Sequence, residues 1–153
     1  GYSYLNTELR SVDVPTNPSP LYQPTDPARL PRVGSDLPLT PHHRITATAT
    51  YTLPLDSSIG RVSLGATWVH TSSQLAGLLA SPYNVMPASN LLNLNLNWNA
   101  VAGTPVDLAA FVTNATREVF PTAVSGNWGS GYESFLYTPP RMYGLRLRYR
   151  FGN

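Results

Sequence analysis

Strict alternation of apolar and polar side chains is the feature that most constrains the fold of this chain of 153 residues. In "LNLNLNWN" (92–99) every second residue is leucine or tryptophan, and every residue between them is asparagine. The same alternation runs through "RITATATYTL" (44–53) and "LRLRYRF" (145–151). Because successive side chains of a β-strand point to opposite faces, each segment predicts a strand with one apolar and one polar face.

Residues 61–71 and 106–113 also alternate, and the opening residues 1–9 have the composition of a strand. Helical periodicity is nearly absent, and proline is missing from all of these segments. Interior strands need their backbone N–H groups for the ladder, so this absence of proline supports the assignment. The sequence therefore predicts an all-β fold of about six antiparallel strands.

The connections between the predicted strands alternate in length. Long connections at 11–41, 72–88 and 114–140 are separated by short turns at 54–60 and 100–104. Short turns at one end of an up-and-down sheet and long loops at the other are typical of outer-membrane β-barrels. A soluble antiparallel sheet, with its arginines in water, is the alternative.

Aromatic residues on the predicted apolar faces fall at two levels. Tyr51, Trp98 and Tyr149 lie near the short turns, whereas Trp68 and Tyr143 lie near the long loops. Aromatic side chains gather at both membrane–water interfaces of transmembrane barrels. We therefore predict a transmembrane β-barrel segment that is open in this chain, with its apolar face convex toward outer-membrane lipid and its polar face concave toward the lumen.

Composition removes several other classes of protein. Only 12% of the residues are charged, and a net charge of +2 does not favour nucleic-acid binding. The chain has no cysteine, which excludes disulfides and thiolate metal sites, and no apolar run approaches the roughly twenty residues of a membrane helix. The chain also opens directly on a predicted strand, which we interpret as a piece of a longer protein.

The predicted lumen face carries amide, carboxylate and guanidinium groups. We expect the carboxylate of Asp107 to pair with an arginine of the last strand, as a structural ion pair. The residues predicted to face the lumen are Asn93, Asn95, Asn97, Asp107, Arg146, Arg148 and Arg150.

Several segments resemble the TonB-dependent outer-membrane receptors. "PRMYGLRLRYRFG" (140–152) resembles the closing strand of that family, and "LLNLNLNWNAVAGTPVDLAAFVTNATREVF" (91–120) is similar to its penultimate hairpin. Within this hairpin, "NATRE" (114–118) stands where the family commonly has an Asn-Leu-Thr-Asp type element, and it departs from the usual acidic ending. "PHHRITATATYTLPL" (41–55) resembles an earlier strand of the family.

The resemblance implies a barrel of about 22 strands around an N-terminal plug, of which residues 1–153 would be the C-terminal part. We expect the plug, the rest of the barrel and the TonB-contacting segment to lie outside this sequence. The implied function is uptake of a scarce nutrient, such as a ferric siderophore, across the bacterial outer membrane. The implied partners are lipid, TonB through the plug, a small nutrient ligand and the barrel assembly machinery, for which Tyr149 and Phe151 form the assembly signal. A passive porin or autotransporter-type barrel is the alternative.

Aromatic residues in the long loops are candidates for stacking against a ligand; packing against neighbouring loops is the alternative. These candidates are Tyr22, Trp128, Tyr132 and Tyr137. We find no nucleophile motif, expect no catalysis and no cofactor, and regard a barrel enzyme as a third reading. We expect no metal site either, because His42 and His43 are adjacent and should point to opposite faces of a strand, and we assign no site to His70.

Overall fold

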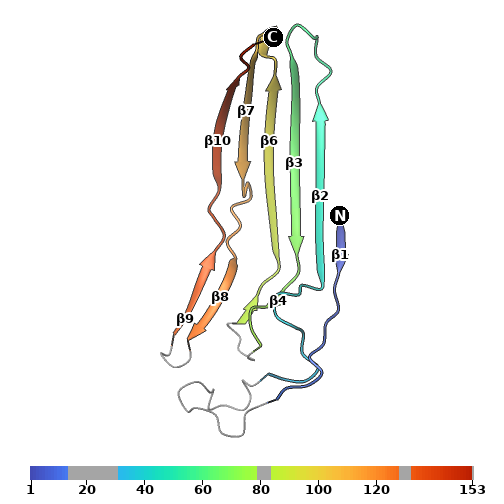
Figure 1. Cartoon of the computed structure of the whole chain (residues 1–153), viewed down its shortest axis with the longest axis vertical. Helices are drawn as coiled ribbons and strands as arrows, with labels where there is room; N and C mark the ends of the chain where they lie inside the picture. Colours follow the sequence, from blue (N-terminus) through green and yellow to red (C-terminus); the bar gives the residue numbers. More distant parts are fainter. Residues whose placement is uncertain (14–30, 79–83, 128–131, 153) are drawn as a thin grey trace.

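The computed structural model describes residues 1–13, 31–78, 84–127 and 132–152. Their main element is a single six-stranded antiparallel sheet, drawn in Figure 1. In order across the sheet, its strands are β1 (Tyr2–Tyr4), β2 (His43–Thr52), β3 (Arg61–Thr71), β6 (Ser89–Asn99), β7 (Val106–Thr113) and β10 (Met142–Tyr149).

The order of these six strands in space equals their order along the chain, which confirms the predicted up-and-down arrangement. Every neighbouring pair is antiparallel. The strands predicted at 61–71 and 106–113 have the predicted bounds. Among the described residues the sheet is open, with β1 and β10 as its two edges.

Two long connections contain short hairpins that the sequence analysis treated as loops. β4 (Gln74–Leu75) pairs with β5 (Val85–Met86), and β8 (Pro121–Asn127) pairs with β9 (Tyr132–Tyr137). Figure 1 shows both hairpins at the end of the sheet away from the turns that join β2 to β3 and β6 to β7. The two ends are called the long-loop end and the short-turn end below.

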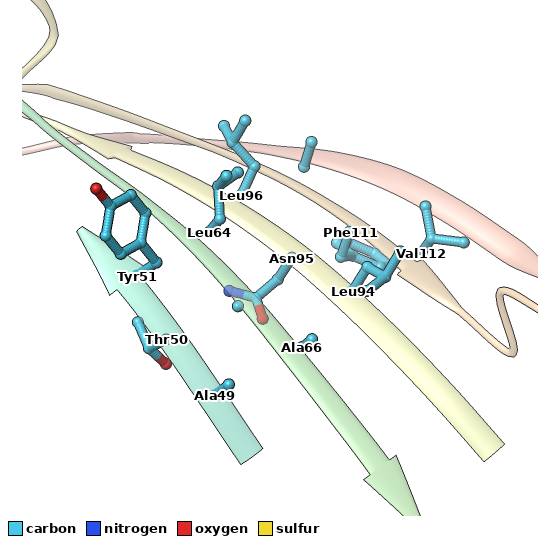
Figure 2. A pocket seen from close by; sticks show the side chains of 12 residues that line it. Ala49, Thr50, Tyr51, Leu64, Ala66, Leu94, Asn95, Leu96, Phe111 and Val112 are labelled. Atoms are coloured by element: carbon cyan, nitrogen blue, oxygen red, sulfur yellow. The ribbon is translucent and has the colours of Figure 1, made fainter. Parts of the chain in front are cut away.

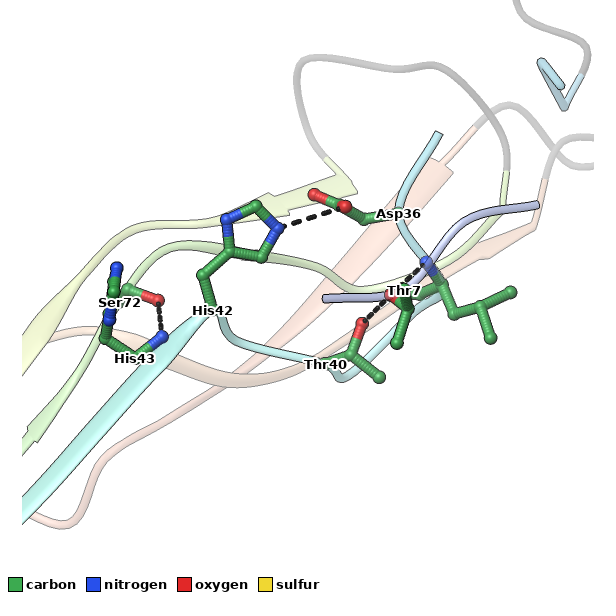
Figure 3. Close-up of polar contacts among 7 residues, drawn as sticks. Thr7, Asp36, Thr40, His42, His43 and Ser72 are labelled. Atoms are coloured by element: carbon green, nitrogen blue, oxygen red, sulfur yellow. Dashed lines mark hydrogen bonds and ion pairs between the residues drawn. The ribbon is translucent and has the colours of Figure 1, made fainter. Parts of the chain in front are cut away.

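The first strand is much shorter than predicted, because only Tyr2–Tyr4 pair with β2 in the ladder. Residues 5–9 continue beside residues 32–42, but their contacts are irregular. The Leu5 N–H donates to the His42 carbonyl at 3.0 Å. The Thr7 hydroxyl lies 3.0 Å from the Thr40 hydroxyl, as Figure 3 shows. Pro38 and Pro41 stand in the facing segment and have no N–H to donate, so a regular ladder cannot continue there.

At the short-turn end the two turns are connected by hydrogen bonds. The Ile59 carbonyl accepts one hydrogen bond from the Trp98 indole N–H at 2.8 Å and another from the Ala102 N–H at 3.0 Å. Ala102 lies in a short 3-10 turn, η3 (Val101–Gly103).

In the turn between β2 and β3, the Asp56 carboxylate accepts a hydrogen bond from the Ser58 backbone N–H. This hydrogen bond, and then one from the Ser58 side chain, lowers the pKa of Asp56 below its ordinary value.

At the long-loop end, Asn114 organises the corner that follows β7. Its side chain is buried, accepts the Glu118 N–H at 2.8 Å, and donates to the carbonyls of Glu118 and Pro139 at 2.8 and 3.2 Å. The Glu118 carboxylate in turn accepts the Asn90 N–H at 2.8 Å, next to the start of the neighbouring β6. Asn114 has φ 49°, a left-handed conformation that asparagine tolerates better than most residues. The segment "NATRE" is therefore a hydrogen-bonded corner between strand and loop.

The described residues contain almost no hydrophobic core. Met86 is the only buried hydrophobic side chain among them, and it lies in the small hairpin rather than in the sheet. The described chain places no second layer over either face of the six-stranded sheet. The predicted six-stranded antiparallel sheet is confirmed, but two separate two-stranded hairpins accompany it.

Replacing Gly60 by alanine should destabilise the short-turn end more than replacing Gly103. Both glycines have left-handed φ values, 94° and 75°, so each alanine carries a similar backbone cost of about 1–2 kcal/mol. A Cβ on Gly60 would also overlap the backbone carbonyls of Asn99 and Ala100, whereas a Cβ on Gly103 would meet nothing within 4 Å. Denaturant unfolding of the two variants measures the difference, and equal losses would show that the turns do not pack as described.

Candidate functional site

The strand register separates the side chains of the sheet into two chemically different faces. Residues directly opposite each other on neighbouring strands lie on the same face. One cross-strand row contains Ala49, Ala66, Leu94, Val112 and Tyr143; the next contains Tyr51, Leu64, Leu96, Ala110 and Leu145; a third contains Val62, Trp98, Leu108 and Leu147. These residues, together with the row Ala47, Trp68 and Leu92, define the apolar face.

The intervening rows define the polar face. They contain Thr48, Thr67 and Asn93; Thr50, Gly65, Asn95, Phe111 and Gly144; Thr52, Ser63, Asn97, Ala109 and Arg146; and Asp107 with Arg148. The register thus brings Asn93, Asn95, Asn97, Asp107, Arg146 and Arg148 onto one face, and Arg150 reaches the same group through Asp107. That this face lines a lumen stays a prediction.

Phe111 is one of the large apolar exceptions on the polar face; Leu91, in the row of Thr46 and Val69, is another. Gly144 lies directly opposite it on the edge strand β10. A Cβ on Gly144 would lie 2.6 Å from the ring carbon Cζ of Phe111, so the ring occupies the space above the glycine. An aromatic side chain that covers a cross-strand glycine supports the pairing of an edge strand.

Within the described chain, the apolar face has no buried side chain: its residues are exposed or partly exposed. Leu64 and Leu94 keep 44% and 40% of their surface accessible, and on the edge strand Leu145 and Leu147 keep 87% and 69%. A soluble monomer rarely exposes an apolar patch that extends over several strands. The described chain places no covering over this face.

Near its centre, the apolar face has a shallow hollow of about 510 Å³. Figure 2 shows its lining residues, which come from β2, β3, β6 and β7. The small side chains of Ala49, Ala66 and Ala110 leave the space, and Tyr51 and Leu64 are among the larger side chains around it. The hollow offers hydrocarbon contacts on one broad surface, but few groups that could orient a polar substrate.

The two ends of the apolar face differ in chemistry. At the short-turn end Tyr149 and Phe151 contact each other edge to face, with ring centroids 4.6 Å apart, and Phe151 is 89% exposed. At the long-loop end the last row contains Tyr2, Ile45, His70 and Asn90. The side chains of His70 and Asn90 are hydrogen-bonded at 2.9 Å, and His70 stacks on Trp68, with ring centroids 5.9 Å apart. Aromatic residues thus lie near both ends of the face, and polar side chains join them at the long-loop end.

Asp107 forms the predicted ion pair with the last strand, although with a different arginine from the one directly opposite. Its Oδ1 accepts the Arg150 guanidinium at 3.1 Å and the Ala100 N–H at 2.9 Å, whereas the register places Arg148 opposite. Asp107 lies at the start of β7 rather than in the middle of the strand. The carboxylate therefore ties the end of β10 to the turn between β6 and β7.

Beside this ion pair, the polar face has a small hollow of about 160 Å³. Its polar lining residues are Asn97, Asn99, Asp107, Arg146 and Arg148. The amide and guanidinium groups give it a hydrogen-bonding surface, but no serine, cysteine or histidine lines it. The chemistry of this hollow is suited to water or small polar solutes rather than to covalent catalysis.

The two adjacent histidines have different partners. His42 Nε2 lies 3.1 Å from an oxygen of Asp36, whereas His43 Nδ1 lies 2.9 Å from the Tyr2 hydroxyl (Figure 3 shows the first contact). Among the described residues, no three His, Cys, Asp or Glu side chains are grouped closely enough to hold a metal ion. The His43–Tyr2 contact connects β2 to β1, whereas the His42–Asp36 contact lies within the segment that precedes β2.

The candidate ligand-stacking residues are only partly described. Tyr22 and Trp128 lie outside the described residues. Tyr132 and Tyr137 both belong to β9 and are 57% and 54% exposed, but they are five positions apart, so they point to opposite faces of that strand. Phe135 instead stacks on Tyr137, with ring centroids 6.1 Å apart.

Two features of the long-loop end were not predicted from the sequence. "NATRE" was predicted only as a family-like element, whereas Asn114 is the most buried polar residue among those described. No role was predicted for Arg117 and Arg141, which line one hollow together. A polar, turn-forming residue directly after a strand could have indicated the corner, but the shared hollow depends on residues distant in sequence.

Among the described residues, no helix has the length and apolarity needed to cross a membrane. Comparison with known protein families, with curated proteins and with solved structures finds no match to this chain.

Proposed function

We propose that this chain is the C-terminal part of the barrel of a TonB-dependent outer-membrane receptor. The receptor would take up a scarce nutrient, such as a ferric siderophore, by binding it rather than by transforming it. The observation that carries the proposal is a one-layer, up-and-down sheet with an exposed apolar face and a separate polar face. A bilayer supplies the missing apolar covering, and a wet lumen suits the polar face.

The open edges of the sheet support membership in a larger barrel. The smallest transmembrane barrels have about eight strands, and only closure removes unpaired edge groups from hydrocarbon. Six strands with free edges at β1 and β10 therefore need further strands on both sides. The resemblance of 140–152 and 91–120 to TonB-dependent receptors is the reason for preferring that family over a smaller passive barrel.

The arrangement of the two ends also agrees with the proposal. Compact, mutually hydrogen-bonded turns suit the periplasmic side, where barrels have short connections. Hairpins such as β8–β9, with exposed aromatic side chains, suit the extracellular side, where a ligand would first bind. In this orientation β2, β6 and β10 run toward the periplasm.

Two adjacent substitutions on β6 test which face contacts lipid. Leu94→Arg places a charge on the apolar face and should destabilise the inserted barrel by about 2–4 kcal/mol. Asn95→Arg places the same charge on the polar face and should cost much less. Urea unfolding of the full-length receptor in vesicles measures both values, and a larger loss for Asn95→Arg would reverse the assignment of the faces.

The aromatic pair formed by Tyr149, the last residue of β10, and Phe151, two residues after it, should act in barrel assembly. Replacing Tyr149 and Phe151 together by serine should lower the amount of heat-modifiable receptor in purified outer membranes, because an edge strand with alternating apolar side chains suits recognition by strand addition. Arg148→Gln is the matched control on the polar face and should insert nearly as well as the unmodified receptor. Equal loss in the two variants would contradict a specific role for the aromatic pair.

Dependence on energy separates the proposed receptor from a passive porin. Cells that carry the full-length gene should accumulate labelled ferric siderophore under iron limitation, and this uptake should stop when TonB is deleted. Binding of the siderophore to the cell surface should remain, because the outer loops would bind without energy. Uptake that continues without TonB would favour a passive barrel, and the absence of any siderophore binding would point to another nutrient.

A further inference from the structure

A hollow of about 290 Å³ lies at the long-loop end, beside the apolar face, and two arginines line it. Arg117 comes from the corner after β7, and Arg141 directly precedes β10. The remaining lining residues are Asn114, Val119, Pro140 and Tyr143. Since only Asn114 among these is buried, the two guanidinium groups are the accessible charged groups of the hollow.

Neither guanidinium has an ion-pair or hydrogen-bond partner among the residues that the structure describes. Glu118 is the nearest carboxylate along the chain, but both of its oxygens accept the Asn90 N–H. Arg150 at the opposite end is paired with Asp107. Two uncompensated guanidinium groups that share one hollow are suited to a doubly charged anion, because each can offer two parallel N–H donors to a phosphate.

The position of the hollow identifies what kind of molecule would bring that phosphate. Tyr143, one of its lining residues, belongs to the apolar face, is 80% exposed, and lies directly opposite Val112. Val112 also lines the large apolar hollow of Figure 2. A continuous surface therefore runs from the two arginines onto hydrocarbon-binding side chains. Such a surface fits an amphiphile with an anionic head and an acyl chain, rather than a free ion or an acidic peptide.

We propose that Arg117 and Arg141 bind the phosphate headgroup of a membrane lipid in the outer leaflet, while its acyl chain lies on the apolar face beside Tyr143. This inference rests on the proposed function, because it needs the apolar face to contact lipid. The arginines then hold a lipid at the border between barrel and loops. The hydrogen-bonded corner around Asn114 positions Arg117 for this contact.

The test uses the full-length receptor in a neutral detergent, titrated with phosphatidic acid and, separately, with phosphatidylcholine of the same acyl chains. Native mass spectrometry counts the lipids that remain bound. The unmodified receptor should prefer phosphatidic acid, and Arg117→Gln or Arg141→Gln should each weaken that binding about fivefold. The double variant should lose most of the preference, whereas replacement of both residues by lysine should retain part of it.

Arg44→Gln is the matched control, since Arg44 is an exposed arginine at the same end of the sheet but on the polar face. It should leave the preference for phosphatidic acid unchanged. An unchanged preference in the Arg117→Gln/Arg141→Gln double variant would overturn the inference. Displacement of the lipid by inorganic phosphate at a similar concentration would overturn the choice of a lipid as the natural ligand.

A separate measurement distinguishes failure of the lipid site from failure of the proposed function. Insertion into phosphatidylcholine vesicles, measured by heat modifiability, depends on the apolar face but needs no anionic headgroup. A receptor that inserts but shows no arginine-dependent preference would contradict only the lipid site. A protein that inserts into no vesicle would contradict the membrane barrel, and the lipid site with it.

Discussion

The backbone ladder between β2, β3, β6, β7 and β10 is the interaction on which the rest of this structure depends. Ordinary globular domains are held by a packed core, but among the described residues only Met86 is a buried hydrophobic side chain. A one-layer sheet in water must leave its apolar face exposed and is at best marginally stable. In hydrocarbon an exposed apolar face is no longer unfavourable, because the apolar side chains contact an apolar solvent. Every backbone polar group must then be paired within the protein, and the ladder supplies that pairing. This difference between water and hydrocarbon is the physical basis of the proposed bilayer location of the sheet.

Hydrogen bonds that involve polar side chains stabilise both ends of the sheet, but they connect different elements at each end. At the short-turn end the Ile59 carbonyl and the Asp107 carboxylate each accept two hydrogen bonds, which connect consecutive turns and fasten the end of β10. At the long-loop end the buried amide of Asn114 satisfies the backbone where the strand ends and the loop begins. Side chains with polar groups thus complete the hydrogen bonding at the points where the ladder stops.

The sequence patterns of this chain differed in how well they predicted its strands and turns. The Leu/Asn alternation at 92–99 predicted both the strand and the two faces, because a period of two admits no other regular structure. The first strand was predicted too long, since its limit depends on Pro38 and Pro41 in the segment that faces it. The hairpin β8–β9 was missed because its strands have only seven and six residues. The turn at 100–104 was predicted, but not the left-handed φ values of 51° at Ala100 and 49° at Ala102, which alanine disfavours.

The sequence by itself determined the fold class, the length of the central strands and the side chains that share a face, since these follow from local periodicity. Only the tertiary structure decided which distant residues meet. Asp107 pairs with Arg150 rather than with Arg148, which lies opposite it in the register, and Arg117 shares a hollow with Arg141 from the far side of a hairpin. Both contacts depend on the register between strands and on the directions that side chains take at the ends of the sheet. The alternation that made the strands predictable does not extend to these ends.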